Sequence, residues 1–409
     1  MQNKNSNNFL SLYLLISIAY VFFSTTNEII NYFLLSMLFI LSMLQIKKKN
    51  IIKKDFNILL WLIFLVFCII SLFSPYNSNL LNSLFFIFCS ILFLLEYLIL
   101  TQNKEEWIDM FIKYLYIFSL IFAIATVTQI IMPGFIDKIK LIYIQSSKIN
   151  LSRKFLLSDS LYSGYNGLVI QTGTNAYLLS IFIGASMFKF LKNEKHKIIY
   201  LLLILIAFVL IILTNKRMLL LASAISILLM YIIYKRFKLK YVLITLLVCF
   251  LSVFILFKYT NVGNNIIQKF TMNQENVLSG RELLYQKMIV NFKSSPIIGV
   301  GIDSKIDGLD GHNIYLQVAS ETGIFGILVF FIIISYNILI TLKYLKIDTI
   351  FKPYFALSFY MQLIFIIWGI TGNPLYDQFS LLSYILILAL EKKCIIKIKG
   401  ENQLWKKKK

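Results

Sequence analysis

Residues 198–213 read IIYLLLILIAFVLIIL, the next four residues read TNKR, and residues 218–234 read MLLLASAISILLMYIIY. Each apolar run approaches the ~20 residues that an α-helix needs to cross the hydrocarbon core of a bilayer. The turn between them holds two cations, Lys216 and Arg217. Charges at the end of an apolar run either snorkel to the interface or are matched by an anion. The stretch therefore predicts a helical hairpin in a membrane, with a basic turn at one surface.

The composition extends this prediction to the whole chain. Of the 409 residues, 59% are hydrophobic and 14% are charged, so an ordinary soluble fold cannot bury all the apolar side chains. We predict an all-α integral membrane protein, because a helix in lipid satisfies its own backbone polar groups. About 12 spans are expected, at residues 9–24, 30–46, 56–74, 80–101, 108–131, 168–190, 198–213, 218–234, 241–258, 312–342, 353–371 and 379–391. No cleavage site follows the first span, so it is expected to be retained.

The basic residues indicate the orientation. The net charge of +21 comes from short runs between apolar segments, a pattern typical of cytoplasmic anchors and not of a nucleic-acid-binding surface. With both termini inside, the inner segments hold about twice as many Lys and Arg residues as the outer ones. The chain is then one polytopic domain, residues 1–409, with its two long loops, 132–167 and 259–311, on the external face. Function is expected on that face.

The larger loop contains a motif at a predicted helix start. Ser279 and Glu282 have the spacing of a capping box, the apolar residues that follow lie on one helical face, and Pro296 ends the pattern. A short amphipathic helix is therefore predicted in the loop 259–311. Arg281 would lie in the first turn, where the helix dipole disfavours a cation unless an anion is shared. This placement suggests phosphate binding. The alternative is a surface arginine paired with Glu282 or Asp303.

The chain has two histidines. His312 opens the tenth span on the face predicted for Arg217 and Arg281, whose charges would keep its imidazole neutral, as a general base requires. A structural hydrogen bond is the alternative role. His196 lies in an inner basic turn and is expected to be solvated only.

Several polar residues are weaker candidates. Asn175, Asn373 and Asp377 lie near the outer ends of spans and are candidates for lining a sugar cavity. Asp303, Asp307 and Asp310 are candidates for sugar hydroxyls or a divalent ion, but their spacing fits no metal motif, and solvated turn residues are the alternative. Glu96 is expected to snorkel inward, and Glu321 to pair with a cation or to face the bundle. All five prolines lie in loops or at span ends, so no proline-broken helix is expected, which disfavours a transporter.

The motifs S-G-R, P-x-x-G-x-G, H-N-x-x-L and E-x-G-x-x-G follow one another in residues 279–326. In this order they resemble the signature region of the O-antigen polymerase (Wzy-type) and O-antigen ligase superfamily, and TNKR resembles the arginine that this superfamily has at the outer start of a helix. The resemblance implies a glycosyltransferase bundle of the GT-C type in the bacterial cytoplasmic (inner) membrane. It implies an inverting reaction at the external face on undecaprenyl diphosphate-linked oligosaccharides, without metal or cofactor.

The resemblance also implies roles for individual residues. Arg217 and Arg281 would bind the diphosphate leaving group, and His312 would take the proton of the acceptor hydroxyl or orient it. Further substrate contacts are expected from Lys216, Asn313, Asn175, Asp377 and Glu321. Lys216 replaces a small residue often found before the arginine, which leaves its role open.

We favour a polymerase of O-antigen or capsule repeat units, served by a flippase and a chain-length regulator. The first alternative is a ligase that moves finished polymer onto lipid A core. The second is a lipid-linked oligosaccharide flippase or another transporter. A transporter predicts polar residues facing a mid-membrane cavity, whereas the sequence pattern suggests that charge is concentrated at one surface.

Overall fold

The computed structural model describes residues 2–46, 55–103, 107–143, 164–192, 195–234, 281–304 and 311–407. Within these ranges every regular element is a helix, and the chain divides into two compact units. Six of these helices are long and apolar enough to cross a membrane, and shorter apolar helices accompany them. The prediction of an all-helical, multi-pass membrane protein is confirmed for this part of the chain.

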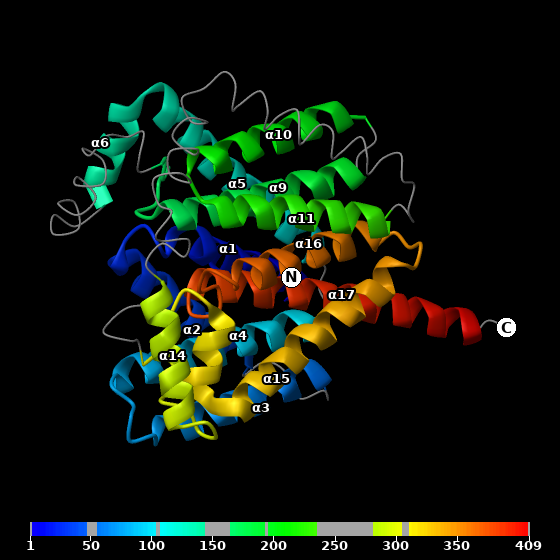
Figure 1. Ribbon diagram of the computed structural model, residues 1–409. Helices are drawn as coiled ribbons and strands as arrows, with labels where there is room; N and C mark the ends of the chain where they lie inside the picture. The colour runs from blue at the N-terminus through cyan, green and yellow to red at the C-terminus, as the bar shows by residue number, and fades with distance from the viewer. Residues whose placement is uncertain are drawn as a thin grey trace. The chain divides into compact units, whose positions relative to one another are not determined.

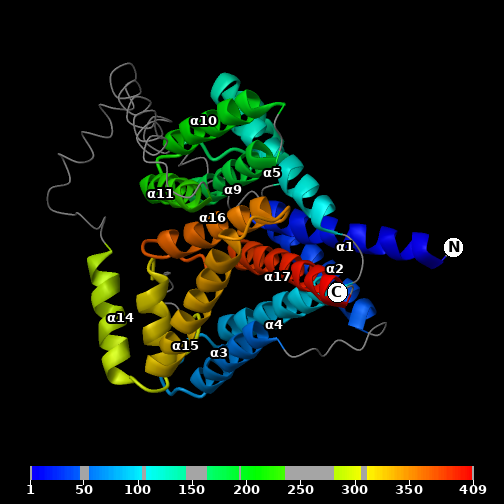
Figure 2. The same cartoon turned by 90° about the vertical axis from the view of Figure 1, so that its right-hand side faces the viewer.

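The first unit is centred on one long helix. It comprises residues Met1–Val21, Tyr32–Phe111 and Arg281–Lys409. Its helices are α1 (Gln2–Phe23), α2 (Glu28–Ile46), α3 (Phe56–Leu72), α4 (Leu80–Gln102), α14 (Glu282–Ser294), α15 (Ile314–Leu345), α16 (Lys352–Trp368) and α17 (Gln378–Lys407). Helix α15 packs against α3, α14, α16 and α17, and α17 packs against α4 (Figures 1 and 2).

The second unit comprises residues Phe22–Asn31 and Ile112–Gly280. Its described helices are α5 (Ile108–Ile131), which begins in the first unit, α6 (Pro133–Tyr143), α9 (Thr172–Lys192), α10 (Lys197–Leu213) and α11 (Arg217–Tyr234). Helix α9 packs against both α10 and α11 (Figure 2). Helices α10 and α11 form the hairpin that the sequence predicts, and TNKR is its turn.

Within the described residues a helix lies at each predicted span, with two departures, and the count of about 12 membrane spans stays a prediction. The ninth span, 241–258, lies outside the described residues, as do residues 259–280 of the large loop. Helix α17 continues to Lys407, past the predicted end at residue 391, because its apolar face continues and buries Cys394, Ile395 and Ile398. Helix α6 lies in a segment for which no helix was predicted.

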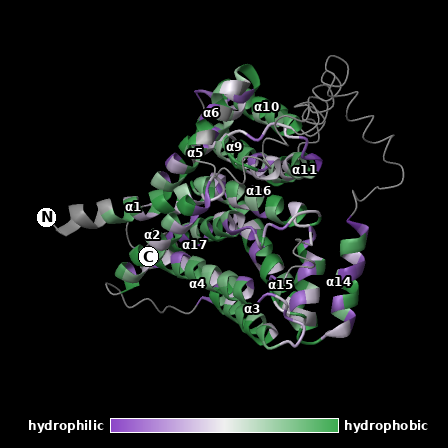
Figure 3. Cartoon of the chain, turned by 90° about the vertical axis from the view of Figure 1, so that its left-hand side faces the viewer, coloured by the Kyte–Doolittle hydropathy of each residue, from purple (hydrophilic) through white to green (hydrophobic). Residues whose placement is uncertain are grey.

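Helix α3 shows how the spans meet lipid. Leu59, Leu62 and Val66 are exposed on one face, while Trp61 and Phe64 are buried on the other. Exposed apolar side chains in such number are typical of a surface that contacts lipid. Figure 3 shows the hydrophobic residues along α3 and α4, and the hydrophilic residues on α14.

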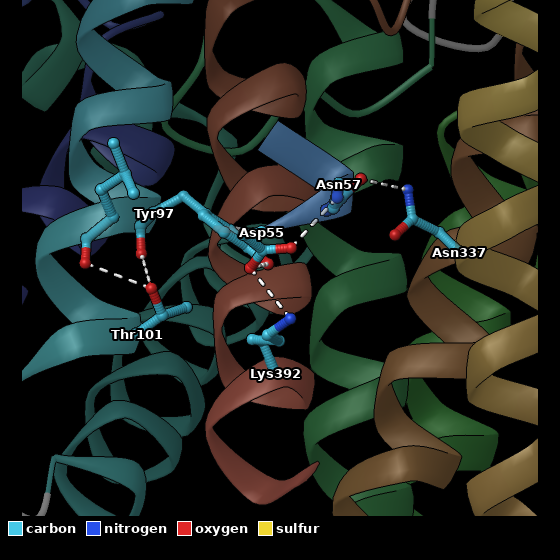
Figure 4. A network of polar contacts seen from close by, with 7 residues as sticks. Asp55, Asn57, Tyr97, Thr101, Asn337 and Lys392 are labelled. Carbon is cyan, nitrogen blue, oxygen red and sulfur yellow. Dashed lines mark hydrogen bonds and ion pairs between the residues drawn. The ribbon is translucent and has the colours of Figure 1, made fainter. Parts of the chain in front are cut away.

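A buried polar network joins four helices of the first unit (Figure 4). The Asp55 carboxylate caps α3 and accepts a hydrogen bond from the hydroxyl of Tyr97 on α4, with an O···O distance of 3.0 Å. It also pairs with the Lys392 ammonium of α17, with an N···O distance of 3.0 Å. The Asn337 amide on α15 donates to the side-chain oxygen of Asn57 on α3. These bonds tie the start of α3 to α4, α15 and α17.

Two buried carboxyl groups correct the sequence interpretation. Glu96 does not snorkel but is buried, because it lies on the face of α4 that also buries Phe93 and Leu100. Glu391 is buried in α17, where one carboxylate oxygen accepts hydrogen bonds from side chains of two other helices. The prediction that Glu96 snorkels was therefore wrong, whereas the interpretation that charge is concentrated at one membrane surface stays a prediction.

Candidate active site

The site in the first unit is built around a break in α15. Gly323 has φ 70° and ψ −171°, so the helix is interrupted there without a proline. The break removes the bonds that the amides of residues 324 and 325 would give to the carbonyls of Ser320 and Glu321. The segment 296–301 supplies partners for the amide of Ile324 and for the carbonyls of Ser320 and Glu321. Backbone groups freed inside a membrane protein must be satisfied in this way.

Three backbone hydrogen bonds dock this segment. The Ile324 amide donates to the Pro296 carbonyl at 2.8 Å. The amides of Val300 and Gly301 donate to the carbonyls of Ser320 and Glu321 at 3.0 and 3.1 Å. The P-x-x-G-x-G and E-x-G motifs are therefore two halves of one backbone junction.

The glycines of the junction are required by space as well as by conformation. A Cβ atom on Gly323 would lie 2.2 Å from the carbonyl oxygen of Ile297, and one on Gly299 would lie 2.2 Å from that of Glu321. Both residues have positive φ, which side chains other than hydrogen disfavour. Any larger residue at either position would force the segment away from α15.

The Glu321 side chain occupies the centre of the junction and is 3% exposed. One carboxylate oxygen accepts from the Gln317 amide at 2.9 Å. The other accepts from the Asp303 backbone N–H at 2.7 Å and from the Tyr376 hydroxyl at 2.6 Å. Burial, with the Glu321 carboxylate as a second cause, raises the pKa of Tyr376 well above its ordinary value, so this phenol remains a donor. Three donors offset part of the cost of burying one carboxylate.

Arg281 directly precedes α14, and the capping box predicted there was wrong. Arg281 is the N-cap residue and its carbonyl accepts the first bond of the helix, so Glu282 is the first helical residue and not the fourth position that a capping box needs. Ser279 lies outside the described residues. The Arg281 guanidinium donates to the carbonyl of Thr371 at 2.9 Å, which anchors it to the turn 369–377 between α16 and α17.

The predicted apolar face of α14 is only partly buried. Met288 is buried, but Leu283 and Ile289 are exposed. Met288 packs against Gly311, where a Cβ atom would lie 2.6 Å from its sulfur. This contact places α14 beside the start of α15.

His312 is held in an unusual backbone conformation. It has φ 52°, in the left-handed region that only a few per cent of non-glycine residues adopt. The Tyr285 hydroxyl donates to its carbonyl at 3.3 Å, and the Tyr285 amide donates to the Arg281 carbonyl at 2.9 Å. One residue of α14 therefore links Arg281 to His312. Strained residues of this kind persist only where their surroundings hold them, as at functional sites.

Two further candidates in this unit have structural contacts. The Asn313 side chain caps α15 and accepts from the amides of Tyr315 and Leu316. Asp377 is half-buried at the start of α17, and its amide donates to the carbonyl of Asn373. Arg281, His312, Asn313, Glu321 and Asp377 thus come from elements that pack together in one unit.

The second unit holds the other three candidates. Arg217 begins α11, and both Arg217 and Lys216 are exposed. Asn215, which precedes them, has φ 59°. The turn is held from one side, because the Tyr165 amide donates to the Leu213 carbonyl at 3.0 Å. The basic turn therefore has a defined backbone although its cations reach the surface.

The side chain of Asn175 makes hydrogen bonds to other residues of the protein. It is buried, and its amide nitrogen donates to the Thr126 hydroxyl at 3.1 Å and to the Tyr165 carbonyl at 3.2 Å. The second of these bonds holds the segment that supports the basic turn. In this structure Asn175 supports the loop and does not line an open cavity.

The sequence interpretation missed four residues that organise these sites. Gln317 lies one turn before Glu321, and this i, i+4 spacing of two polar residues in an apolar helix was the available signal. Tyr376 lies between two residues that were singled out, Asn373 and Asp377, but a tyrosine in an apolar sequence carries no signal by itself. The other two are Thr371, which contributes only its carbonyl, and Lys140, a buried cation that donates to the side chain of Asn166.

The comparisons with known proteins bear on this region. A family model described as O-antigen ligase matches residues 201–331. The matched segment is about a third of the chain and contains Arg217, Arg281, His312 and the break at Gly323. No curated protein matches the chain. The match at residues 201–331 supports the assignment of this chain to the O-antigen polymerase and ligase superfamily.

Proposed function

We propose that the protein is a membrane glycosyltransferase that polymerises repeat units of a surface polysaccharide. The donor would be an oligosaccharide linked to undecaprenyl diphosphate, and the acceptor the non-reducing end of another lipid-linked repeat unit. The reaction would invert the anomeric centre at the external face of the cytoplasmic membrane, with both termini inside. The family match and the membrane helices support this proposal in its general form.

In the proposed reaction the acceptor oxygen bonds to the anomeric carbon of the donor sugar. The bond between that carbon and the diphosphate oxygen breaks, and undecaprenyl diphosphate leaves. His312 takes the proton of the acceptor hydroxyl, or orients that hydroxyl. Arg217 and Arg281 bind the diphosphate, since fixed cations stabilise charge that develops on a leaving group, and the planar guanidinium matches phosphate oxygens.

The observation that supports this proposal best is the link between Arg281 and His312. Tyr285 bonds to the backbone of both residues, and Arg281 is anchored on the turn 369–377. The Arg281 guanidinium and the backbone of His312, which come from separate motifs, are held by neighbouring elements, and this supports a shared role for the two residues. Lys216 and Asp377 remain proposed substrate contacts.

A ligase is the second candidate, because the matching family model carries that description. It would use the same three residues and a donor on the same lipid carrier, but it would move finished polymer to a lipid A core acceptor. The acceptor that distinguishes the two activities is the variable to test.

The test supplies the purified, reconstituted protein with undecaprenyl diphosphate repeat units and follows product length on a gel. A ladder of lengths is expected from the wild type. It should be lost, or reduced by about 100-fold or more, in Arg217→Ala, Arg281→Ala and His312→Ala variants. The matched controls are His196→Ala and Lys293→Ala, which remove exposed side chains of the same kinds elsewhere and should leave the ladder intact.

One result would contradict the polymerase, and another would contradict the residue roles. Unchanged monomer with the wild type, combined with transfer of preformed polymer to lipid A core, would indicate the ligase. Full activity in the three alanine variants would show that these residues do not perform the chemistry.

A further inference from the structure

The contacts of Gln317 connect the Glu321 carboxylate to the backbone beside His312. The Gln317 amide nitrogen donates to Glu321, and its oxygen accepts from the Gly311 backbone N–H at 3.1 Å. Gln317 and Glu321 are both buried. The side-chain amide of Gln317 therefore has one orientation that satisfies both neighbours, with its nitrogen toward Glu321 and its oxygen toward Gly311. The acceptor Glu321 determines this orientation.

Gly311 connects this direction to His312. It directly precedes His312, and a side chain on Gly311 would meet both Met288 and the oxygen of Gln317. Its position is therefore tightly bounded. The backbone of His312 has positive φ and relaxes unless it is held. The bond from Gly311 to Gln317 is one restraint on the N-terminal side of His312, and the Tyr285 bond is one on its carbonyl side.

The second oxygen of Glu321 connects to the anchor of Arg281. It accepts from Tyr376, which lies in the turn 369–377. The Arg281 guanidinium donates to the carbonyl of Thr371 in the same turn. This turn is also tied to the start of α15, because the Ile314 amide donates to the Gly369 carbonyl at 2.9 Å. The same carboxylate thus restrains the supports of both Arg281 and His312.

We propose that Glu321 is a positioning residue, which through Gln317 and Tyr376 fixes the backbone of His312 and the turn that anchors Arg281. It acts as an acceptor for three donors and does not bind substrate. This inference rests on the proposed function for the roles of Arg281 and His312. The hydrogen-bond polarity on which it depends belongs to the fold and can be measured without substrate.

The polarity leads to a sharp test. In Glu321→Gln the Asp303 N–H, which belongs to the backbone and cannot be reversed, requires the oxygen of the new amide. The NH₂ group then faces the NH₂ group of Gln317, and Gln317 must turn and present a donor to the Gly311 N–H. In the exchanged double variant, Gln317→Glu with Glu321→Gln, every donor again faces an acceptor, while the total volume and charge of the two side chains stay the same.

The assay is the polymerisation reaction with reconstituted protein and undecaprenyl diphosphate repeat units. We expect Glu321→Gln to lower kcat by about 10-fold to 100-fold, as a misplacement of around 1 Å does, with KM changed less than about 3-fold. The exchanged pair should recover kcat to within about 3-fold of the wild type. The control is Glu391→Gln, which makes the same change at another buried carboxylate with three side-chain donors and should leave kcat within about 3-fold.

The outcomes separate the inference from the proposed function. Wild-type kcat in Glu321→Gln, or an exchanged pair no more active than that variant, would overturn the positioning role. If the wild type does not elongate its substrate, the proposed function fails, and thermal unfolding of the same four proteins still tests the polarity. The polarity is supported if Glu321→Gln unfolds at a lower temperature or fails to fold while the exchanged double variant unfolds near the wild-type temperature. A double variant no more stable than Glu321→Gln overturns it.

Discussion

Replacing Gly323 by alanine tests the junction that organises the site. The new Cβ atom would lie 2.2 Å from the Ile297 carbonyl oxygen. The conformation at φ 70° and ψ −171° is one that essentially only glycine adopts, and another residue there costs about 1–3 kcal/mol. If the segment moves away, it also loses the three backbone bonds of Pro296, Val300 and Gly301, each worth about 1 kcal/mol.

Together these effects predict a loss of about 4–6 kcal/mol, a large part of the ~5–15 kcal/mol that stabilises a typical protein. At roughly 2 °C for each kcal/mol, the unfolding temperature of the purified protein in detergent should fall by about 8–12 °C. Tryptophan fluorescence during heating would measure it. Gly134→Ala on α6 is the control, because nothing lies within 4 Å of its Cβ position and alanine favours a helix. An unfolding temperature within about a degree of wild type in Gly323→Ala would refute the account of the junction.

Three further changes have defined outcomes. Lys392→Met leaves the Asp55 carboxylate without its cation and should destabilise the protein by about 1–3 kcal/mol. The double variant Lys392→Met with Asp55→Asn should cost less than the sum of the two single changes. Strictly additive losses in thermal unfolding would count against the network. Asn313→Ala removes the cap of α15 and should lower the stability of the protein by about 1 kcal/mol. Asn313→Asp keeps a capping oxygen and should keep both stability and activity. Loss of activity in a stable Asn313→Asp protein would indicate a substrate contact instead. Tyr376→Phe removes one of the three donors of the Glu321 carboxylate and should destabilise the protein by about 1–3 kcal/mol; an unfolding temperature equal to that of the wild type would contradict the assigned hydrogen bond.

The hairpin of α10 and α11 could be predicted because it depends on local properties alone. Apolar length and a short basic turn at Lys216 and Arg217 are sufficient to specify it. The break in α15 could not be predicted in this way. Glycine is common within membrane helices, and the interruption at Gly323 is stable only because the segment at Pro296 returns to it.

The burial of Glu96 and Glu391 was also beyond the sequence. In a membrane helix that is apolar all round, no hydrophobic stripe marks which face meets protein and which meets lipid. The roles proposed for Arg281 and His312 came from their predicted places at helix starts on the external face and from the resemblance. Their connection through Tyr285 came from the packing of α14 on α15, which is a tertiary contact.

The junction at Gly323 has a consequence for recognising distant relatives. Because main-chain atoms alone make its three bonds, the side chains at Ile297, Ile298 and Val300 are free to vary as far as those bonds are concerned. What an inherited junction has to preserve is the interval from the proline to the two glycines and the matching glycine after the glutamate. A search for other members of this lineage would gain more from the spacing of these few residues than from overall percentage identity.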